Sequence, residues 1–298
     1  MNVQHQFGGQ WTEQKLDHIK KYLHAYRQIF SSNPKASYFN TTYVDAFAGP
    51  GFRNVSNKSD SLMIPLYGEE VYEDEDAKSL QKGSVQIALE TKSPFDNYIF
   101  IDKNPEFCSE LKNLRQKYPE ISNRITIACD DANTYIQQWC NETNWRKNRA
   151  VVFLDPYGME VSWATLESIA KTEAIDLWIL FPLGSVNRML TKKHHPEDTW
   201  CNRLTSFFGT EDWKKSFYKH TISLTLFGEK EEIIKDADFN SIEQYFIDRL
   251  KTIFFKVAKN PLKLRNSMNS PIFLLCFAAG NHRGAPTAIE IAQHILRK

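Results

Sequence analysis

The sequence predicts an α/β fold built on a doubly wound, mostly parallel sheet. Short apolar runs that end in an acidic residue recur along the chain, and each is followed by a stretch of helical periodicity. One run, from Ala150 to Leu154, has no polar alternation, which is typical of a strand covered on both faces. Alternating strands and helices favour a parallel sheet whose ligands bind at the carboxyl ends of its strands. We therefore expect a functional site at that edge.

The composition is that of an ordinary globular protein. Of the 298 residues, 42% are hydrophobic and 24% are charged, and the formal net charge is +1. Near-neutrality counts against a free-standing nucleic-acid binder, although it is compatible with a local basic patch. Five scattered cysteines without a C-x-x-C pair predict free thiols in a cytoplasmic protein rather than a zinc site. The chain lacks an apolar run long enough to cross a bilayer, so we expect no membrane association.

We expect residues 1–298 to form a single domain that carries two insertions. Residues 53–82 are polar and acidic, and they are interpreted either as a surface loop or as a lid over a ligand. Residues from about 185 to 265 interleave aromatic and basic side chains. This second pattern suits a helical cap with an aromatic core or a nucleic-acid groove. We favour the cap, because acidic residues dilute the positive charge.

The chain opens with an amphipathic helix, expected over residues 12–30. Leu16, Ile19 and Leu23 recur at helical spacing, and Thr12 is a plausible N-cap. The lysines and histidines between the apolar positions are expected to face solvent.

The first strand ends at Asp45 and leads into a glycine loop that closes at Gly51. Glycines there let the backbone turn sharply and approach a ligand closely. The spacing D-x-F-x-G-x-G resembles the first motif of S-adenosylmethionine (SAM) methyltransferases, especially those that act on amino groups of nucleobases. The alternative is a structural turn. The resemblance implies that the methionine part of SAM is held by Asp45, Phe47, Ala48, Gly49, Pro50 and Gly51.

Two further strands also end in acids. Residues 97–102 end at Asp102, whose carboxylate could accept hydrogen bonds from both ribose hydroxyls of a nucleoside, or could cap the next helix. A carboxylate that binds the ribose hydroxyls would suit NAD as well as SAM. The glycine loop after Asp45, however, lacks the G-x-G-x-x-G sequence running into a helix that is typical of NAD-binding proteins. After residues 124–129, likeness to the same enzymes implies that Asp131, beside Ala132, contacts the adenine amino group, with Asp130 as the alternative.

The fourth strand ends in Asp155-Pro156-Tyr157-Gly158. This loop resembles the [Asp/Asn]-Pro-Pro-[Tyr/Phe] loop of amino-nitrogen methyltransferases, with one proline fewer. An exocyclic amine is a poor nucleophile, because its lone pair is delocalised into the ring. Asp155 and the Pro156 carbonyl could accept its two N–H bonds, and Tyr157 could stack on the base. The alternative is a proline-stabilised strand end with Tyr157 in the core.

Residues 176–183 and 271–278 are expected to form two more buried strands. The chain as a whole resembles the three-Cys-motif partner protein family. The matching stretches include Trp11 to Lys15, Val44 to Gly51, Phe100 to Pro105, Phe153 to Gly158 and Ile175 to Gly184. The resemblance implies a class I methyltransferase-like fold. It also implies a partner protein with a three-cysteine motif, which looks like a radical-SAM enzyme.

These observations predict a SAM-dependent methyltransferase that acts on an exocyclic amine of a nucleobase in RNA or DNA, without a metal. Two other classes stay open. One is an auxiliary or non-catalytic SAM-binding subunit of the partner protein, and the other is a small-molecule methyltransferase. The methyltransferase hypothesis requires four carboxylates, those of Asp45, Asp102, Asp131 and Asp155, to lie along one edge of the sheet.

Overall fold

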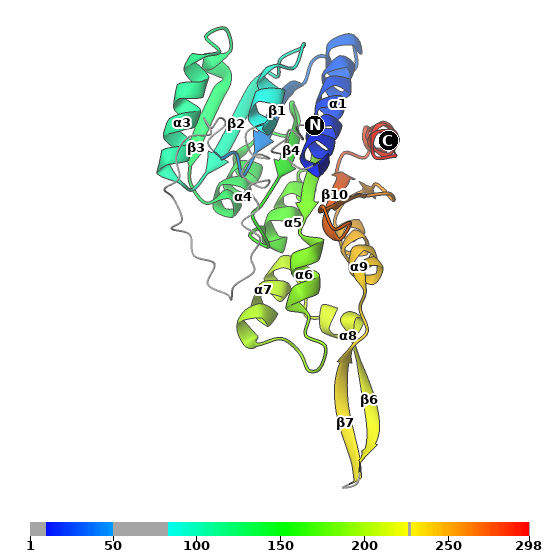
Figure 1. Cartoon of the computed structure of the whole chain (residues 1–298). Coiled ribbons are helices and arrows are strands. Elements are labelled where there is room, and N and C mark those ends of the chain that lie inside the picture. Colours follow the sequence, from blue (N-terminus) through cyan, green and yellow to red (C-terminus); the bar gives the residue numbers. More distant parts are fainter. Residues whose placement is uncertain (1–9, 50–82, 226–227, 298) are drawn as a thin grey trace, which may run out of the picture.

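The centre of the fold is a mixed sheet (Figure 1). The computed structural model describes residues 10–49, 83–225 and 228–297. The strands of this sheet are β1 (Asn40–Asp45), β2 (Asn97–Asp102), β3 (Ile125–Cys129), β4 (Asn148–Leu154), β5 (Ile175–Phe181), β8 (Lys256–Val257), β9 (Leu262–Arg265) and β10 (Pro271–Ala279). Their order is β3-β2-β1-β4-β5-β10-β8, and β9 also pairs with β10. Neighbours from β3 to β5 are parallel, whereas β10 runs antiparallel to β5. The expected α/β fold with a mostly parallel sheet is therefore confirmed.

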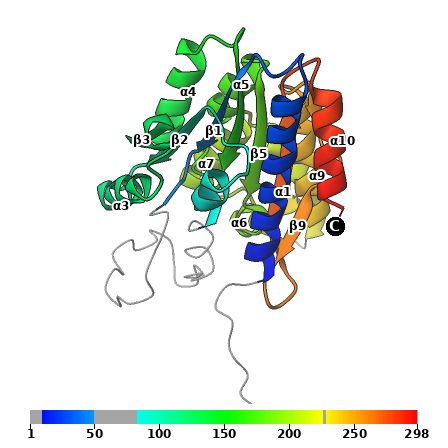
Figure 2. The same ribbon diagram turned by 90° about the horizontal axis from the view of Figure 1, so that it is seen from above.

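Helices cover both faces of this sheet (Figure 2). One face carries α1 (Gln10–Ser32), the helical residues 83–89, α3 (Pro105–Gln116) and α10 (Ala285–Ile295). The other face carries α4 (Ala132–Glu142), α5 (Trp163–Lys171), α7 (Asp198–Phe208) and α9 (Phe239–Lys251). A separate apolar core forms under each layer. Because β4 is covered on both sides, its residues from Ala150 to Leu154 are all buried, which explains their unbroken apolar sequence.

Helix α1 crosses the sheet with its first turns at the carboxyl ends of the strands. It includes Thr12, which is therefore not an N-cap. Ile19 and Leu23 are buried as expected, but the expectation that the intervening lysines and histidines face solvent is wrong for two of them. Lys15 and His18 are buried: the ammonium group of Lys15 meets Asp155 at the end of β4, and Nδ1 of His18 is hydrogen-bonded to the Gln14 carbonyl of the same helix.

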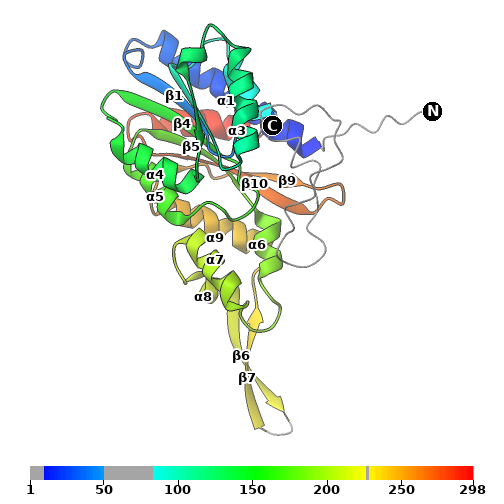
Figure 3. The same cartoon turned by 90° about the vertical axis from the view of Figure 1, so that its left-hand side faces the viewer.

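The second insertion contains α6 (Leu183–Met189), α7, α8 (Trp213–Phe217), the paired strands β6 (Tyr218–Thr225) and β7 (Gly228–Lys235), and α9. Phe207, Phe208 and Trp213 are buried, so these aromatic residues form a core rather than an open groove. The hairpin of β6 and β7 projects away from the body of the protein (Figures 1 and 3). It corrects the expectation of an entirely helical cap. Residues 218–225 largely alternate between apolar or aromatic and polar side chains, a strand pattern that the helical interpretation overlooked.

Within the described ranges, every helix is too short or too polar to traverse a lipid bilayer. All five cysteines lie in these ranges as free thiols, as their spacing predicts.

Candidate active site

Parallel pairing places the ends of β1 and β4 side by side. Asp45, the last residue of β1, is in register with Phe153 of β4, and Asp155 follows two residues later. Both carboxylates are buried beneath the first turns of α1, where the charge of Asp155 acts on Asp45. The structure therefore brings together two of the four predicted acids.

Lys15 is the residue of this site that sequence reasoning missed. Its ammonium group donates a hydrogen bond to Oδ2 of Asp155 and lies 5.2 Å from the centre of the Phe153 ring. The side chain is fully buried, and that of Asp155 is only 6% exposed. One signal was available, because Lys15 is four residues from both Trp11 and Ile19 and so belongs to the apolar face of α1.

Within the described residues, neither oxygen of the buried Asp45 carboxyl accepts a hydrogen bond of ordinary length and angle, although the Ser84 hydroxyl and the Phe47 N–H lie close to it. Burial raises the pKa of Asp45 to about 7, while the nearby Ser84 hydroxyl opposes the shift. The charge of Asp155 raises the pKa of Asp45 further, and Lys15 and the Phe47 N–H lower it. A buried carboxylate with such weak hydrogen bonding among the described residues is suited to a cationic ligand, because it can accept several charge-assisted hydrogen bonds.

Asp102 connects the end of β2 to the glycine loop. Its Oδ2 accepts a hydrogen bond from the Gly49 N–H at 2.9 Å, and its Oδ1 accepts one from the Asn104 N–H at 2.8 Å. Asn104, rather than Asp102, is the N-cap of α3. Burial raises the pKa of Asp102, and the two N–H groups oppose that shift. Asp102 therefore holds the loop in shape, and its predicted ribose contact stays a prediction.

Gly49 has a φ of +58°, in the left-handed region that favours glycine. We expect Gly49→Ala to lower the free energy of unfolding by about 1–2 kcal/mol, because a Cβ is strained there. The measurement is urea unfolding. Gly158→Ala is the matched control, since an added Cβ at Gly158 would meet no atom within 4 Å. Equal stability of the two variants would contradict the assigned strain.

Asp131 lies at the end of β3 as the N-cap of α4. Its Oδ1 accepts a hydrogen bond from the Thr134 N–H at 2.9 Å, and its side chain is exposed. No contact with the other three acids is formed among the residues that the structure describes. Asp130, the alternative, accepts a hydrogen bond from the Asp131 N–H. The predicted contact of Asp131 and the buried Ala132 with adenine therefore stays a prediction.

The loop after β4 separates a buried part from an exposed part. Pro156 is buried, whereas the side chain of Tyr157 is 54% exposed. The alternative that placed Tyr157 in the core is therefore wrong. In the glycine loop, Phe47 is half-buried and Ala48 is fully buried. Pro50, Gly51 and the acidic insertion 53–82 lie outside the described residues.

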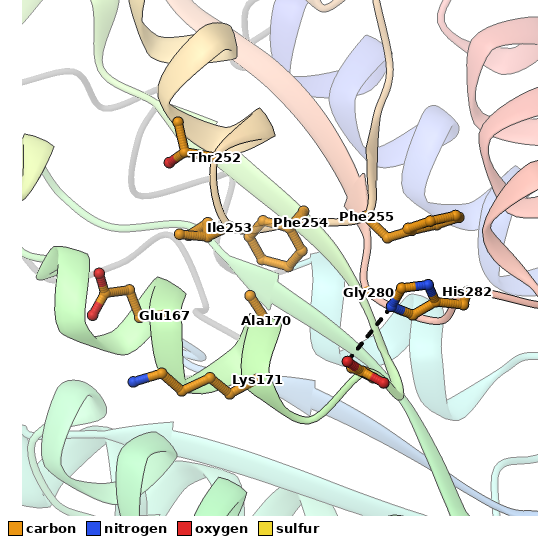
Figure 4. Close-up of a pocket in the computed structure, with 10 residues that line it drawn as sticks. Glu167, Ala170, Lys171, Thr252, Ile253, Phe254, Phe255, Gly280 and His282 are labelled. Carbon is orange, nitrogen blue, oxygen red and sulfur yellow. Dashed lines mark ion pairs between the residues drawn. The ribbon is translucent and has the colours of Figure 1, made fainter.

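A separate hollow lies at the opposite edge of the sheet, near the start of β5 (Figure 4). There the rings of Phe255 and His282 are 4.1 Å apart between centres, and Glu173 lies 3.5 Å from Nε2 of His282. Another hollow lies between α1 and α10. None of the predicted site residues lines either hollow.

Comparisons with known proteins bear on the fold. No family model matches the sequence, and no curated protein matches it significantly. Protein LPL1258 from Legionella pneumophila, of the DUF519 family, has a similar structure with a TM-score of 0.51 and 13% identity, over 98% of this chain and 92% of that one.

Two looser similarities are to methyltransferase structures. Magnesium protoporphyrin IX methyltransferase from Synechocystis PCC 6803, solved with bound SAM, has a TM-score of 0.31 and 12% identity over 76% of this chain and 80% of that one. The glycopeptide N-methyltransferase MtfA, complexed with S-adenosyl-L-homocysteine (SAH), has a TM-score of 0.32 and 9% identity, over 86% and 88% of the two chains. The strand order and the antiparallel β10 define a doubly wound, Rossmann-like α/β fold, and LPL1258 is similar to this chain in fold.

Proposed function

We propose that this chain is a SAM-dependent methyltransferase that acts on an exocyclic amine of a nucleobase in RNA or DNA. The observation that supports the proposal best is the position of Asp45 and Asp155. They are buried together at the ends of neighbouring parallel strands, next to the glycine loop that Asp102 holds. That is the edge at which ligands bind in open α/β sheets.

The residues at this edge fit SAM. The unsatisfied oxygens of Asp45 would accept hydrogen bonds from the ammonium group of its methionine part, beside Phe47, Ala48 and Gly49. Asp102 would receive the ribose, and Asp131 with Ala132 would receive the adenine. When bound, SAM supplies a methyl group attached to a sulfonium sulfur, which a nitrogen lone pair can attack.

The loop after β4 fits the amine. Asp155 and the Pro156 carbonyl would accept the two N–H bonds of an exocyclic amino group and hold its nitrogen in line for attack. The exposed ring of Tyr157 offers a surface for stacking, a contact worth about 1–3 kcal/mol per base. A base within a polymer would have to leave its stack to reach this loop.

We expect Asp155→Asn to lower methyl transfer to total RNA or total DNA at least 100-fold, with little change in SAH affinity. The amide offers one acceptor oxygen and no charge, so it orients the amine poorly. Labelled methyl from SAM measures transfer, and calorimetry measures SAH binding. Glu167→Gln, at the far edge of the sheet, is the control. If Asp155→Asn transfers methyl groups as fast as the wild type, Asp155 has no role in the reaction.

A second candidate is an auxiliary SAM-binding subunit. It is favoured by the contact of Lys15 with Asp155, because this carboxylate already has a buried partner. On the sequence resemblance, its partner would be a cytoplasmic protein with a three-cysteine motif. This candidate predicts SAH binding without methyl transfer to RNA, DNA or small metabolites unless the partner is added. Transfer to small metabolites alone would favour the small-molecule methyltransferase.

A further inference from the structure

Lys15 places its ammonium group beside the loop after β4. Burial lowers the pKa of Lys15, whereas the charge and hydrogen bond of Asp155 and the charge of Asp45 oppose that shift. The ammonium group binds Asp155, lies over the Phe153 ring, and is close enough to Asp45 for their charges to interact. Tyr43 completes the surroundings as a neutral group, because burial raises the pKa of its hydroxyl well above the usual value. The charge of Asp155 is therefore already balanced from within the protein.

This charge cannot move away easily, since α1 is anchored on both sides of Lys15. Trp11 packs on Phe273 with 5.4 Å between ring centres. Further along the helix, the Tyr22 hydroxyl donates a hydrogen bond of 2.6 Å to Asp176. Full burial also denies Lys15 an alternative hydrogen-bond partner in water. The amino group of Lys15 is thus held in place beside Asp155.

We propose that Lys15 makes the acceptor position at Asp155 selective for an uncharged, conjugated amino group and excludes protonated aliphatic amines from that position, whereas Asp45 receives the ammonium group of SAM. The inference rests on the proposed function, because it describes the acceptor of the same site. Lys15 bonds to one oxygen of Asp155, and the proposal assigns the other, Oδ1, to the substrate. Neutral N–H donors can bond to a carboxylate that already has a counter-ion.

A second cation behaves differently, because it is repelled by Lys15 at short range. Two like charges about 5 Å apart, at an effective dielectric constant of about 20, disfavour binding by on the order of 100-fold. Primary aliphatic amines such as the lysine side chain have a pKa of about 10.4 and carry that charge at neutral pH. Nucleobase amino groups do not. The arrangement therefore separates two classes of amine before chemistry begins.

The test is equilibrium binding in the presence of SAH, which needs no methyl transfer. The probes are spermidine as a protonated aliphatic amine, and adenosine, cytidine and guanosine as uncharged aromatic amines. We expect Lys15→Gln to bind spermidine on the order of 100-fold more tightly than the wild type. Lys15→Arg should exclude spermidine as the wild type does. Lys21→Gln, on an exposed part of the same helix, is the control.

The outcomes separate this inference from the proposed function. Tight spermidine binding by the wild type or by Lys15→Arg would overturn the inference, even if Lys15→Gln does not fold. Unchanged weak binding by a folded Lys15→Gln would overturn it as well. Absence of methyl transfer to any nucleic acid, with the expected spermidine selectivity intact, would instead reject the proposed reaction and leave the role of Lys15 standing.

Discussion

Asp45→Asn should abolish SAH and SAM binding while making the protein more stable than the wild type above pH 7. The binding loss follows from the removal of the one fully buried carboxylate at the methionine end of the proposed site. The gain in stability follows from the pKa of Asp45, which burial raises from 3.8 to about 7. Ionising this group in the folded protein is costly, and an amide of the same shape avoids that cost.

The pH dependence has a definite sign. Below pH 3.8 the Asp45 carboxyl is neutral in both states and its ionisation costs nothing. As the pH rises to about 7, the unfolded chain loses the proton first, so the wild type loses stability. A difference of about three pKa units corresponds to about 4 kcal/mol, fully developed only above pH 7. This is an upper value, because Lys15 and Ser84 can adjust to the charge.

Urea unfolding of the wild type and of Asp45→Asn at pH 5, 6, 7 and 8 measures this effect. The difference between their free energies of unfolding is plotted against pH, so that the contributions of other titrating groups cancel. We expect the advantage of Asp45→Asn to grow across this range. Wild-type affinity for SAH should fall about tenfold per pH unit below 7, since a protonated Asp45 cannot pair with an ammonium group. A flat difference curve would contradict the buried state of Asp45, and SAH binding by the variant would contradict its role.

Lys15→Met is expected to destabilise the protein by about 3–5 kcal/mol, because it leaves Asp155 buried without its counter-ion. The double variant Lys15→Met/Asp155→Asn should recover much of that loss, since neither charge then remains. Urea unfolding of the four proteins in the double-mutant cycle gives the coupling energy.

The control for this cycle is Lys21→Met, which removes the exposed ion pair of Lys21 with Asp17 on the same helix. Exposed pairs contribute only about 0–1 kcal/mol, because water screens them. Additive losses in the Lys15 and Asp155 cycle would show that the two side chains do not stabilise each other. If Lys15→Met has the same free energy of unfolding as Lys21→Met, the Lys15 side chain is not a buried charged group that pairs with Asp155.

Much of the fold follows from the sequence alone. Apolar runs such as Ala150 to Leu154 identify buried strands, and the alternation with helices identifies a parallel sheet. Acidic residues at strand ends, such as Asp45, are then assigned to one edge, because parallel strands share a direction. The buried Phe207 and Phe208 agree with a cap that has an aromatic core, whereas the stacking role of the exposed Tyr157 stays a prediction. These inferences use only local spacing.

Tertiary structure decided how the charges are arranged. The contact of Lys15 with Asp155 joins residues 140 positions apart, and only the packing of α1 on the sheet buries both. The same packing buries Asp45, and the approach of β2 to the glycine loop engages Asp102 with Gly49. Local spacing places each acid at the sheet edge, but the charge that an acid carries depends on its distance from water and on its neighbours in space. Those are properties of the assembled chain.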